Sequence, residues 1–197
     1  MPTEALALGA LFIATMSFTP GPANLSLLSV GASIGLGRAL PYLAGVWVGG
    51  LVVIVPGAAG LGALFLALPE VFLALKFLGF AYICWLAWKL ARMGFGGTAL
   101  EVAPSFWAGV GLHPVNPKAY VQCVMVFSAF VSPDAPYLPQ AVILAVLCLV
   151  LMMMATSLWG LGGDAIRLFV RDVQIMRAVA VGASALMVVS VGAALVL

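Results

Sequence analysis

The sequence predicts an all-α membrane protein with six transmembrane helices, arranged as two inverted three-helix repeats in which the first and fourth helices are broken. The first observation is composition: 65% of the 197 residues are apolar and only 7% are charged, with a mean hydropathy of +1.25. A soluble domain carries about 25% charged residues, so these few charges exclude a soluble fold. The other two observations are the spacing of the charges and a proline motif that recurs in each half of the chain.

The charges divide the chain into six apolar runs. Because about 20 residues are needed to cross the hydrocarbon core, each run is long enough to span the bilayer once. The predicted helices cover residues 5–34, 39–66, 71–91, 104–131, 138–161 and 178–197.

Basic residues are concentrated on one side of this predicted bundle. The loops after the first, third and fifth helices contain Arg38, Lys89, Arg92, Arg167, Arg171 and Arg177. The opposite side has only Lys76. Since cytoplasmic loops carry an excess of Lys and Arg, we expect a multi-pass protein of the cell (inner) membrane with both termini outside.

The segment 164–177 has helical periodicity. Its polar residues Asp164, Arg167, Arg171 and Gln174 recur at spacings of three and four. This pattern is typical of a helix that lies in the cytoplasmic interface. An ordinary basic loop fits the segment equally well.

Three motifs relate the first half of the chain to the second. The matched pairs, at offsets of 95 to 100 residues, are Pro22 with Pro117, Leu40-Pro41 with Leu138-Pro139, and Gly60-Leu61-Gly62 with Gly160-Leu161-Gly162. Each repeat, about 1–95 and about 104–197, crosses the membrane three times, so the second copy is inverted. Inverted repeats are typical of secondary transporters, whose substrate site lies near the bilayer midplane. We therefore expect a single transmembrane transporter domain over residues 1–197.

The first and fourth helices each contain a segment that cannot continue as a regular helix. Two prolines flank a glycine between Ser17 and Asn24, and two more lie between His113 and Lys118. Irregular backbone at membrane depth requires protein or water beside it, so both breaks are expected to line a cavity. The half-helices that resume there present N–H groups and a positive dipole end, which suit a carboxylate.

The predicted substrate-binding residues are Thr19, Pro20, Gly21, Pro22, Asn24, Asn116, Pro117 and Lys118. Pro22 and Pro117 fit the first position of a helix, and Asn116 fits the N-cap before it. The alternative is that the prolines are plain kinks and the asparagines bond between helices.

Lys118 is a cation placed about 20 Å from the cytoplasmic start of its helix. Its expected partner is the carboxylate of the substrate or a backbone carbonyl at a break, unless Lys118 itself loses a proton. The alternative is an anchor that snorkels to the interface. His113, the only histidine, either relays a proton or is a satisfied core residue. Lys118 and His113 are the two candidates for proton coupling.

Several absences narrow the predicted function. No Asp or Glu lies inside a predicted span, which argues against a metal site or a cationic substrate and for a small zwitterion or anion. The chain has no P-loop and almost no residues for acid–base catalysis, so neither an ATP-driven process nor an enzyme is expected. Cys84, Cys123 and Cys148 lie in apolar runs and are expected to be core residues. No cofactor is predicted, and a net charge of +2 gives no reason to expect nucleic acid.

Five segments carry a family likeness. They are Thr19-Pro20-Gly21-Pro22-Ala23-Asn24, the glycine-rich stretch from Gly45 to Gly62, Gly79-Phe80-Ala81-Tyr82, Trp85-Leu86-Ala87-Trp88-Lys89 and Val115-Asn116-Pro117-Lys118-Ala119. On these residues the chain resembles the LysE/RhtB family of amino-acid exporters over essentially its whole length. The resemblance implies six helices in two inverted repeats and efflux of small amino acids coupled to the proton gradient. The segment from Tyr82 to Lys89, with Ser105-Phe106-Trp107-Ala108, looks most like the branch that exports cysteine and O-acetylserine.

Gly50 departs from the family pattern, because many members carry an acidic residue there. The departure puts in doubt a coupling mechanism through that carboxylate and fits a neutral substrate. The expected partners are a small amino-acid substrate and the lipid bilayer, and a homodimer is left open. The second interpretation is a small channel or membrane assembly subunit without active transport, and a membrane enzyme is a weak third.

The orientation gives the first testable prediction. Because the basic loops are expected in the cytoplasm, an alkaline phosphatase fused to the C-terminus should be active and a fused green fluorescent protein should stay dark. Activity assays and fluorescence of cells producing each fusion measure this. The reverse pattern would show that the six-helix arrangement or its orientation is wrong.

Overall fold

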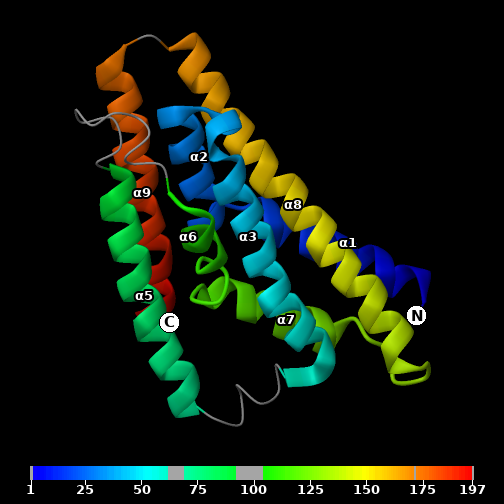
Figure 1. Cartoon of the computed structure of the whole chain (residues 1–197). Helices are drawn as coiled ribbons and strands as arrows, with labels where there is room; N and C mark the ends of the chain where they lie inside the picture. The colour runs from blue at the N-terminus through cyan, green and yellow to red at the C-terminus, as the bar shows by residue number, and fades with distance from the viewer. Residues whose placement is uncertain (1, 62–68, 92–103, 171, 197) are drawn as a thin grey trace.

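The structure, a computed structural model, describes residues 2–61, 69–91, 104–170 and 172–196. Within these ranges every regular element is helical, which confirms the predicted all-α class. In chain order (Figure 1) the elements are α1 (Thr3–Phe18), α2 (Pro22–Ile34), α3 (Leu36–Pro56), the π-helical turn η1 (Gly57–Leu61), α5 (Pro69–Ala91), α6 (Phe106–Val110), α7 (Pro117–Ala129), α8 (Tyr137–Phe169) and α9 (Val173–Val196). Gly62, Arg92 and Arg171, on which the sequence predictions also rest, lie outside the described residues.

The helical path is interrupted at both places where the sequence predicts a break. α1 and α2 are separated by residues 19–21 and bent by 47° relative to each other. α6 and α7 are separated by residues 111–116. Pro22 is the first residue of α2 and Pro117 is the first residue of α7. The N–H that proline lacks would have no acceptor within the helix at this position.

By length and composition, two of the described helical segments could cross a membrane alone. They are Leu36–Gly60 and Tyr137–Phe169, and the bent pair α1 and α2 makes a third if it is counted as one span. The remaining spans of the six-helix arrangement stay a prediction.

The structure corrects the prediction for residues 164–177. α8 continues through Asp164 and ends only at Phe169, and α9 begins at Val173. The Arg167 guanidinium pairs with the Asp164 carboxylate one turn earlier, with Nη2 to Oδ1 at 2.9 Å. Asp164 and Arg167 therefore belong to the end of α8 and Gln174 to the start of α9, so the described part of this segment forms no separate interfacial helix.

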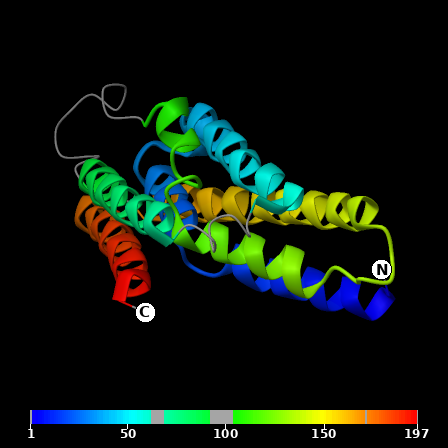
Figure 2. The same ribbon diagram turned by 90° about the horizontal axis from the view of Figure 1, so that it is seen from below.

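α2 is the central element of the bundle. It packs against α8 and α9, and 11 of its 13 residues are buried. Figure 2 shows α5 and α9 side by side on one flank, away from α1 and α7. The approach of α2 to α8 depends on glycine: a Cβ on Gly163 would collide with the Leu28 carbonyl oxygen and lie 2.8 Å from the Ala32 nitrogen. Small residues of this kind let helix backbones touch inside a membrane.

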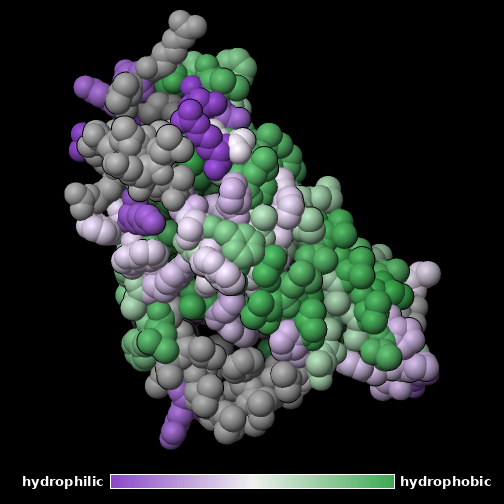
Figure 3. Space-filling view, viewed as in Figure 1, coloured by the Kyte–Doolittle hydropathy of each residue, from purple (hydrophilic) through white to green (hydrophobic). Residues whose placement is uncertain are grey.

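Much of the outer surface along the bundle is apolar. α8 exposes a stripe of large apolar side chains at helical spacing, Val142, Val146, Val150, Met154, Leu158 and Leu161. A continuous exposed apolar face of this kind suits contact with lipid. Figure 3 shows hydrophobic residues over much of the visible face and strongly hydrophilic ones toward the upper end.

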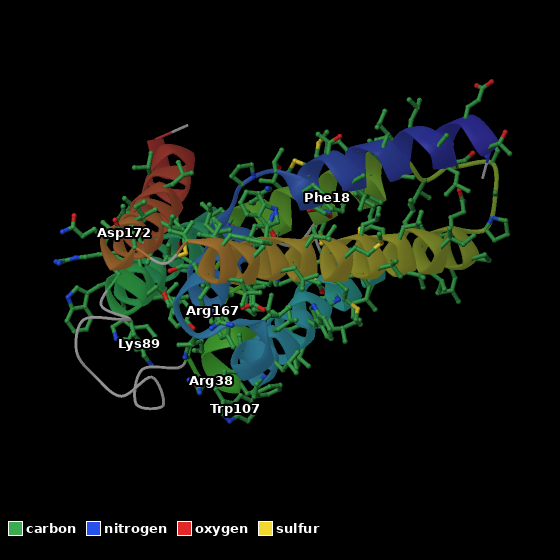
Figure 4. The ribbon with its side chains drawn as sticks, turned by 90° about the horizontal axis from the view of Figure 1, so that it is seen from above. Phe18, Arg38, Lys89, Trp107, Arg167 and Asp172 are labelled. Carbon is green, nitrogen blue, oxygen red and sulfur yellow. The ribbon has the colours of Figure 1, made fainter. Side chains whose placement is uncertain are left out.

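Basic residues of three helices lie at that upper end. Arg38 stands in the first turns of α3, Lys89 in the last turn of α5 and Arg167 in the last turn of α8, and Figure 4 labels all three in a view from above. Their common end agrees with the one-sided charge distribution of the sequence. The orientation of this end toward the cytoplasm stays a prediction.

The α2–α8 contact gives the second testable prediction. Gly163→Ala should destabilise the protein by about 1–3 kcal/mol, because the added methyl forces the two backbones apart. The matched control is Gly182→Ala in α9, where a Cβ would meet nothing within 4 Å. That control should be neutral or stabilising, since alanine favours a helix over glycine. Thermal unfolding of both purified variants in detergent measures the difference, and equal melting temperatures would contradict the predicted packing.

Candidate functional site

The carbonyl groups at the end of α1 have lost their helical partners and are held by side chains instead. Asn24 Nδ2 donates to the carbonyl oxygens of Ser17 at 2.8 Å and Thr19 at 2.9 Å. Trp159 Nε1, from α8, donates to the Phe18 carbonyl at 3.2 Å. Asn24 is 5% exposed, so its amide serves this break and not the solvent. Two other helical segments therefore satisfy the backbone of the first break, as irregular backbone at membrane depth requires.

The Lys118 ammonium reaches across from the second break to the first. Its Nζ donates to Thr19 Oγ1 at 2.8 Å and to the Thr19 carbonyl at 3.1 Å. Of the partners expected for Lys118, the structure shows the backbone carbonyl at a break, with a hydroxyl beside it. These two bonds tie together segments that are 99 residues apart in the chain.

The second break is capped mainly by its own residues. Asn116 is the N-cap of α7, as predicted, and its Oδ1 accepts from the Lys118 backbone N–H at 3.1 Å. The Tyr120 hydroxyl, one turn into α7, donates to the Pro114 carbonyl at 2.6 Å. The Asn116 N–H in turn donates to the His113 carbonyl at 3.0 Å. The N-terminus of α7 is thereby fixed with its positive dipole end toward the first break.

A cavity of about 60 Å³ lies between the two breaks. This volume has room for about four to six waters. Its polar lining consists of Ser17, Asn24, His113, Asn116, Lys118, Gln122 and Thr156. Its apolar and sulfur-containing lining includes Met16, Val53, Ile54, Cys123, Cys148 and Met152. None of the lining residues within the described ranges is Asp or Glu. The cavity thus offers one cation, neutral hydrogen-bonding groups and a soft apolar wall.

The structure brings together about half of the predicted binding residues. Gly21, Asn24, Asn116 and Lys118 line the cavity, and His113 lines it as well. Thr19 is exposed beside the cavity and contacts it through Lys118. The three prolines are not in the lining: Pro20 is exposed, while Pro22 and Pro117 are buried as the first residues of their helices.

Several lining residues were missed by the sequence predictions. Cys148, Met152 and Thr156 lie on one face of α8 at intervals of four residues, and Gln122 and Cys123 lie one turn beyond Lys118 on α7. The α7 pair could have been found by extending helical periodicity from Lys118. α8 carries no break or charge at this depth to mark its inner face. Cys123 and Cys148 are buried, as expected for core residues, but they also form part of the cavity wall.

Gly50, the position that departs from the family pattern, lies at the cavity. A Cβ at Gly50 would collide with the Met152 sulfur and lie 3.7 Å from His113 Cδ2. The absence of a side chain there makes room for Met152. Any larger residue at position 50 would have to displace Met152 and would lie beside the imidazole.

The comparison with known proteins agrees with this architecture. Residues 14–197 match the family described as LysE type translocator. The chain belongs to this family. The cysteine/O-acetylserine efflux proteins of Escherichia coli (strain K12) and of Escherichia coli O1:K1 / APEC are each 35% identical to it over 148 residues, which is 75% of this chain and 76% of theirs. The protein of the same name from Shigella flexneri serotype 5b (strain 8401) is 34% identical over the same length. No solved structure matches the chain.

The family assignment settles the broad class of the protein. The family match confirms the resemblance found from the break motifs. Together with the exposed apolar helices, it identifies a multi-pass membrane protein of a translocator family rather than an enzyme. The cavity between the breaks is therefore the candidate substrate site.

The cap on the first break gives the third testable prediction. Asn24→Leu should lower the free energy of unfolding by about 1–3 kcal/mol, because it leaves buried carbonyl oxygens without donors. The control is Ser33→Ala in the same helix, where the lost bond is the local one to the Ser29 carbonyl. That loss should stay within about 0.5 kcal/mol. Thermal unfolding in detergent compares the two, and an Asn24→Leu protein as stable as the control would show that the break does not depend on this amide.

Proposed function

We propose that the protein is a secondary transporter that exports small neutral amino acids or their derivatives, such as cysteine or O-acetylserine, from the cytoplasm, driven by the proton gradient. The observation that carries the proposal is the Lys118 ammonium, held at a midchain break beside a cavity without carboxylates. The printed names of the relatives, cysteine/O-acetylserine efflux protein, support the choice of substrate.

The substrate carboxylate is the natural ligand of Lys118. In the empty site the ammonium is held by the Thr19 hydroxyl and carbonyl, which are neutral acceptors. A carboxylate forms stronger, charge-assisted bonds and so takes the place of Thr19. The N-terminal N–H groups of α2 and α7 add a favourable dipole for an anion at the same place. The proposed binding residues at the cavity are Gly21, Asn24, Asn116 and Lys118, with Thr19 beside them. Pro20, Pro22 and Pro117 belong to the breaks that position these residues.

The architecture that serves this function is a six-span bundle of two inverted repeats in one domain. The spans are α1 with α2, α3 and α5 in the first repeat, and α6 with α7, α8 and α9 in the second, with both termini outside. The Lys118 bonds to Thr19 support this arrangement, because they join the broken helix of one repeat to that of the other. A substrate site where inverted repeats meet is the arrangement expected of a carrier.

The candidates for proton coupling are Lys118 and His113. They are the Lys and His side chains among the described residues that line the cavity. Coupling through a carboxylate at position 50 is excluded in this chain, because residue 50 is glycine.

A channel without active transport is the competing function. A carrier exchanges labelled for unlabelled substrate across a membrane, whereas a channel lets both leak down their gradients. Counterflow of labelled cysteine in proteoliposomes separates the two, and leak without exchange would favour the channel.

Lys118 gives the fourth testable prediction. Lys118→Ala should abolish efflux while the protein still inserts, because the cavity loses its one cation for the carboxylate. Lys118→Arg should retain little activity, since the planar guanidinium of arginine does not replace the compact ammonium that lies between Thr19 and the cavity. Growth of producing cells under toxic levels of cysteine, with protein levels measured in the membrane, gives the readout.

The matched control is Lys89→Ala. Lys89 lies in α5 over the Trp85 ring and does not line the cavity. That variant should protect cells as well as the original protein does. Full resistance of Lys118→Ala at normal protein level would show that Lys118 is only an anchor.

A further inference from the structure

His113 carries a buried polar atom that nothing in the described structure satisfies. The residue is 9% exposed, and its Nε2 has no hydrogen-bond partner. The backbone of His113 is used, since its carbonyl accepts from the Asn116 N–H, but the ring nitrogen is not. A buried unsatisfied group costs about 1–3 kcal/mol, so such an atom at a cavity wall points to a partner that is absent from the empty site.

The surroundings of the ring leave room for that partner. His113 lines the cavity between the breaks, and the α3 residue beside its Cδ2 is Gly50, which has no side chain. Met152 occupies the space over Gly50. A methionine side chain has three rotatable bonds and adapts easily, so it can withdraw when a ligand arrives.

Three other polar residues of the lining already bind groups within the protein. The Asn24 amide nitrogen holds two carbonyls, and Asn116 Oδ1 holds the Lys118 backbone N–H. The Thr156 hydroxyl accepts from Trp47 Nε1 at 3.1 Å and donates to the Met152 carbonyl at 2.8 Å. A zwitterionic substrate whose carboxylate is bound by Lys118 still needs an acceptor for its ammonium, and no carboxylate is in the described lining.

We propose that His113 Nε2 accepts the substrate ammonium, and that a proton and the ammonium compete for this one lone pair. The inference rests on the proposed export function and adds to it the residue that recognises the amino group of the substrate. In the tautomer with its proton on Nδ1, neutral imidazole offers Nε2 as an acceptor, whereas protonated imidazole only donates. The site therefore holds either a proton or an amino acid at His113, and never both.

This competition produces proton-coupled export without a carboxylate. On the cytoplasmic side the Nε2–H bond breaks, the proton passes to cytoplasmic water, and the ammonium N–H forms a hydrogen bond to Nε2. On the outer side a proton from external water binds Nε2, and the amino acid leaves. One proton enters for each amino acid exported, and no other group changes its charge.

The other titratable groups around the ring do not offer the same lone pair. Those lining or bordering the cavity region within the described residues are Lys118, Tyr120, Cys123 and Cys148, and Tyr82 lies close to Gly111 in the same break. The Lys118 ammonium only donates, and the two tyrosine hydroxyls donate to the carbonyls of Ala108 and Pro114. Thiols are weak acceptors.

The test uses labelled L-cysteine counterflow in proteoliposomes of the full chain. For the original protein, the apparent KM should rise about tenfold per pH unit on the acidic side, as expected for competition with one proton. His113→Gln offers an amide oxygen to the ammonium but takes up no proton. It should keep counterflow, lose the pH dependence of KM, and no longer accumulate cysteine against its gradient when a pH gradient is imposed. The control Cys84→Ser, in α5 and outside the cavity lining, should keep the pH dependence.

A second arm tests recognition of the amino group. His113→Leu should weaken binding of cysteine at least tenfold in inhibition of counterflow. It should leave 3-mercaptopropionate, in which a hydrogen replaces the amine and no donor remains, unaffected. Equal losses for both compounds would mean a structural role and would overturn the inference.

A third arm needs no substitution. Addition of O-acetylserine to the purified protein in weakly buffered, mildly acidic detergent should release protons, because the ammonium displaces the proton of His113. Binding of O-acetylserine without release of protons would overturn this inference but not the proposed function. The same holds for a His113→Gln protein that still accumulates cysteine in response to the pH gradient. If the original protein shows no counterflow with cysteine, O-acetylserine or serine, the proposed function fails and this inference fails with it.

Discussion

The structure depends on one constraint: a peptide group inside a membrane must find a hydrogen-bond partner within the protein. The break after α1 frees carbonyl groups at membrane depth, and each described solution brings in a different helix. Asn24 comes from α2, Trp159 from α8 and Lys118 from α7. The close approach of α2 to α8 at Gly163 is part of the same solution, because it places Trp159 within reach of the Phe18 carbonyl. The break thus organises the packing around it.

The two breaks are unequal, and this inequality bears on transport. The polar backbone groups of the second break are bonded by its own neighbours, Asn116 and Tyr120, whereas the first break is bonded by Lys118 from the second. Any movement of α7 away from α1 must give up both Lys118 bonds to Thr19. In the function we propose, the carboxylate of the substrate replaces them and so lowers the cost of that movement. Binding is thereby linked to rearrangement through differential contacts, which is what coupling between a site and a conformational change requires.

The sequence predicts the breaks well because proline and glycine act on local backbone geometry. Pro22, Pro117 and the Asn116 cap need only their own neighbours to take effect, and the structure shows each where it was expected. Trp159 and the α8 cavity face could not be predicted, because their role depends on which helix packs beside the break. Residues 164–177 were misread because the end of α8 and the start of α9 share a polar spacing that, in sequence, cannot be told from a single interfacial helix. Lys118 illustrates the boundary: its importance is visible in the sequence, but its partner Thr19, 99 residues away, is a matter of tertiary structure.

Charge balance in the cavity argues for the class of substrate. The described lining has one ammonium and no carboxylate, so a bound carboxylate brings the pair to neutrality. Two unit charges 4 Å apart interact by about 4 kcal/mol at an effective dielectric constant of 20. The ammonium of a zwitterion is then balanced within its own molecule and needs only a neutral acceptor. A dibasic amino acid would add a second cation with nothing to balance it, at a cost of the same order. A site built from Lys118, amides and an imidazole, with glycine at position 50, therefore favours our proposal that the substrate is a small amino acid with an uncharged side chain.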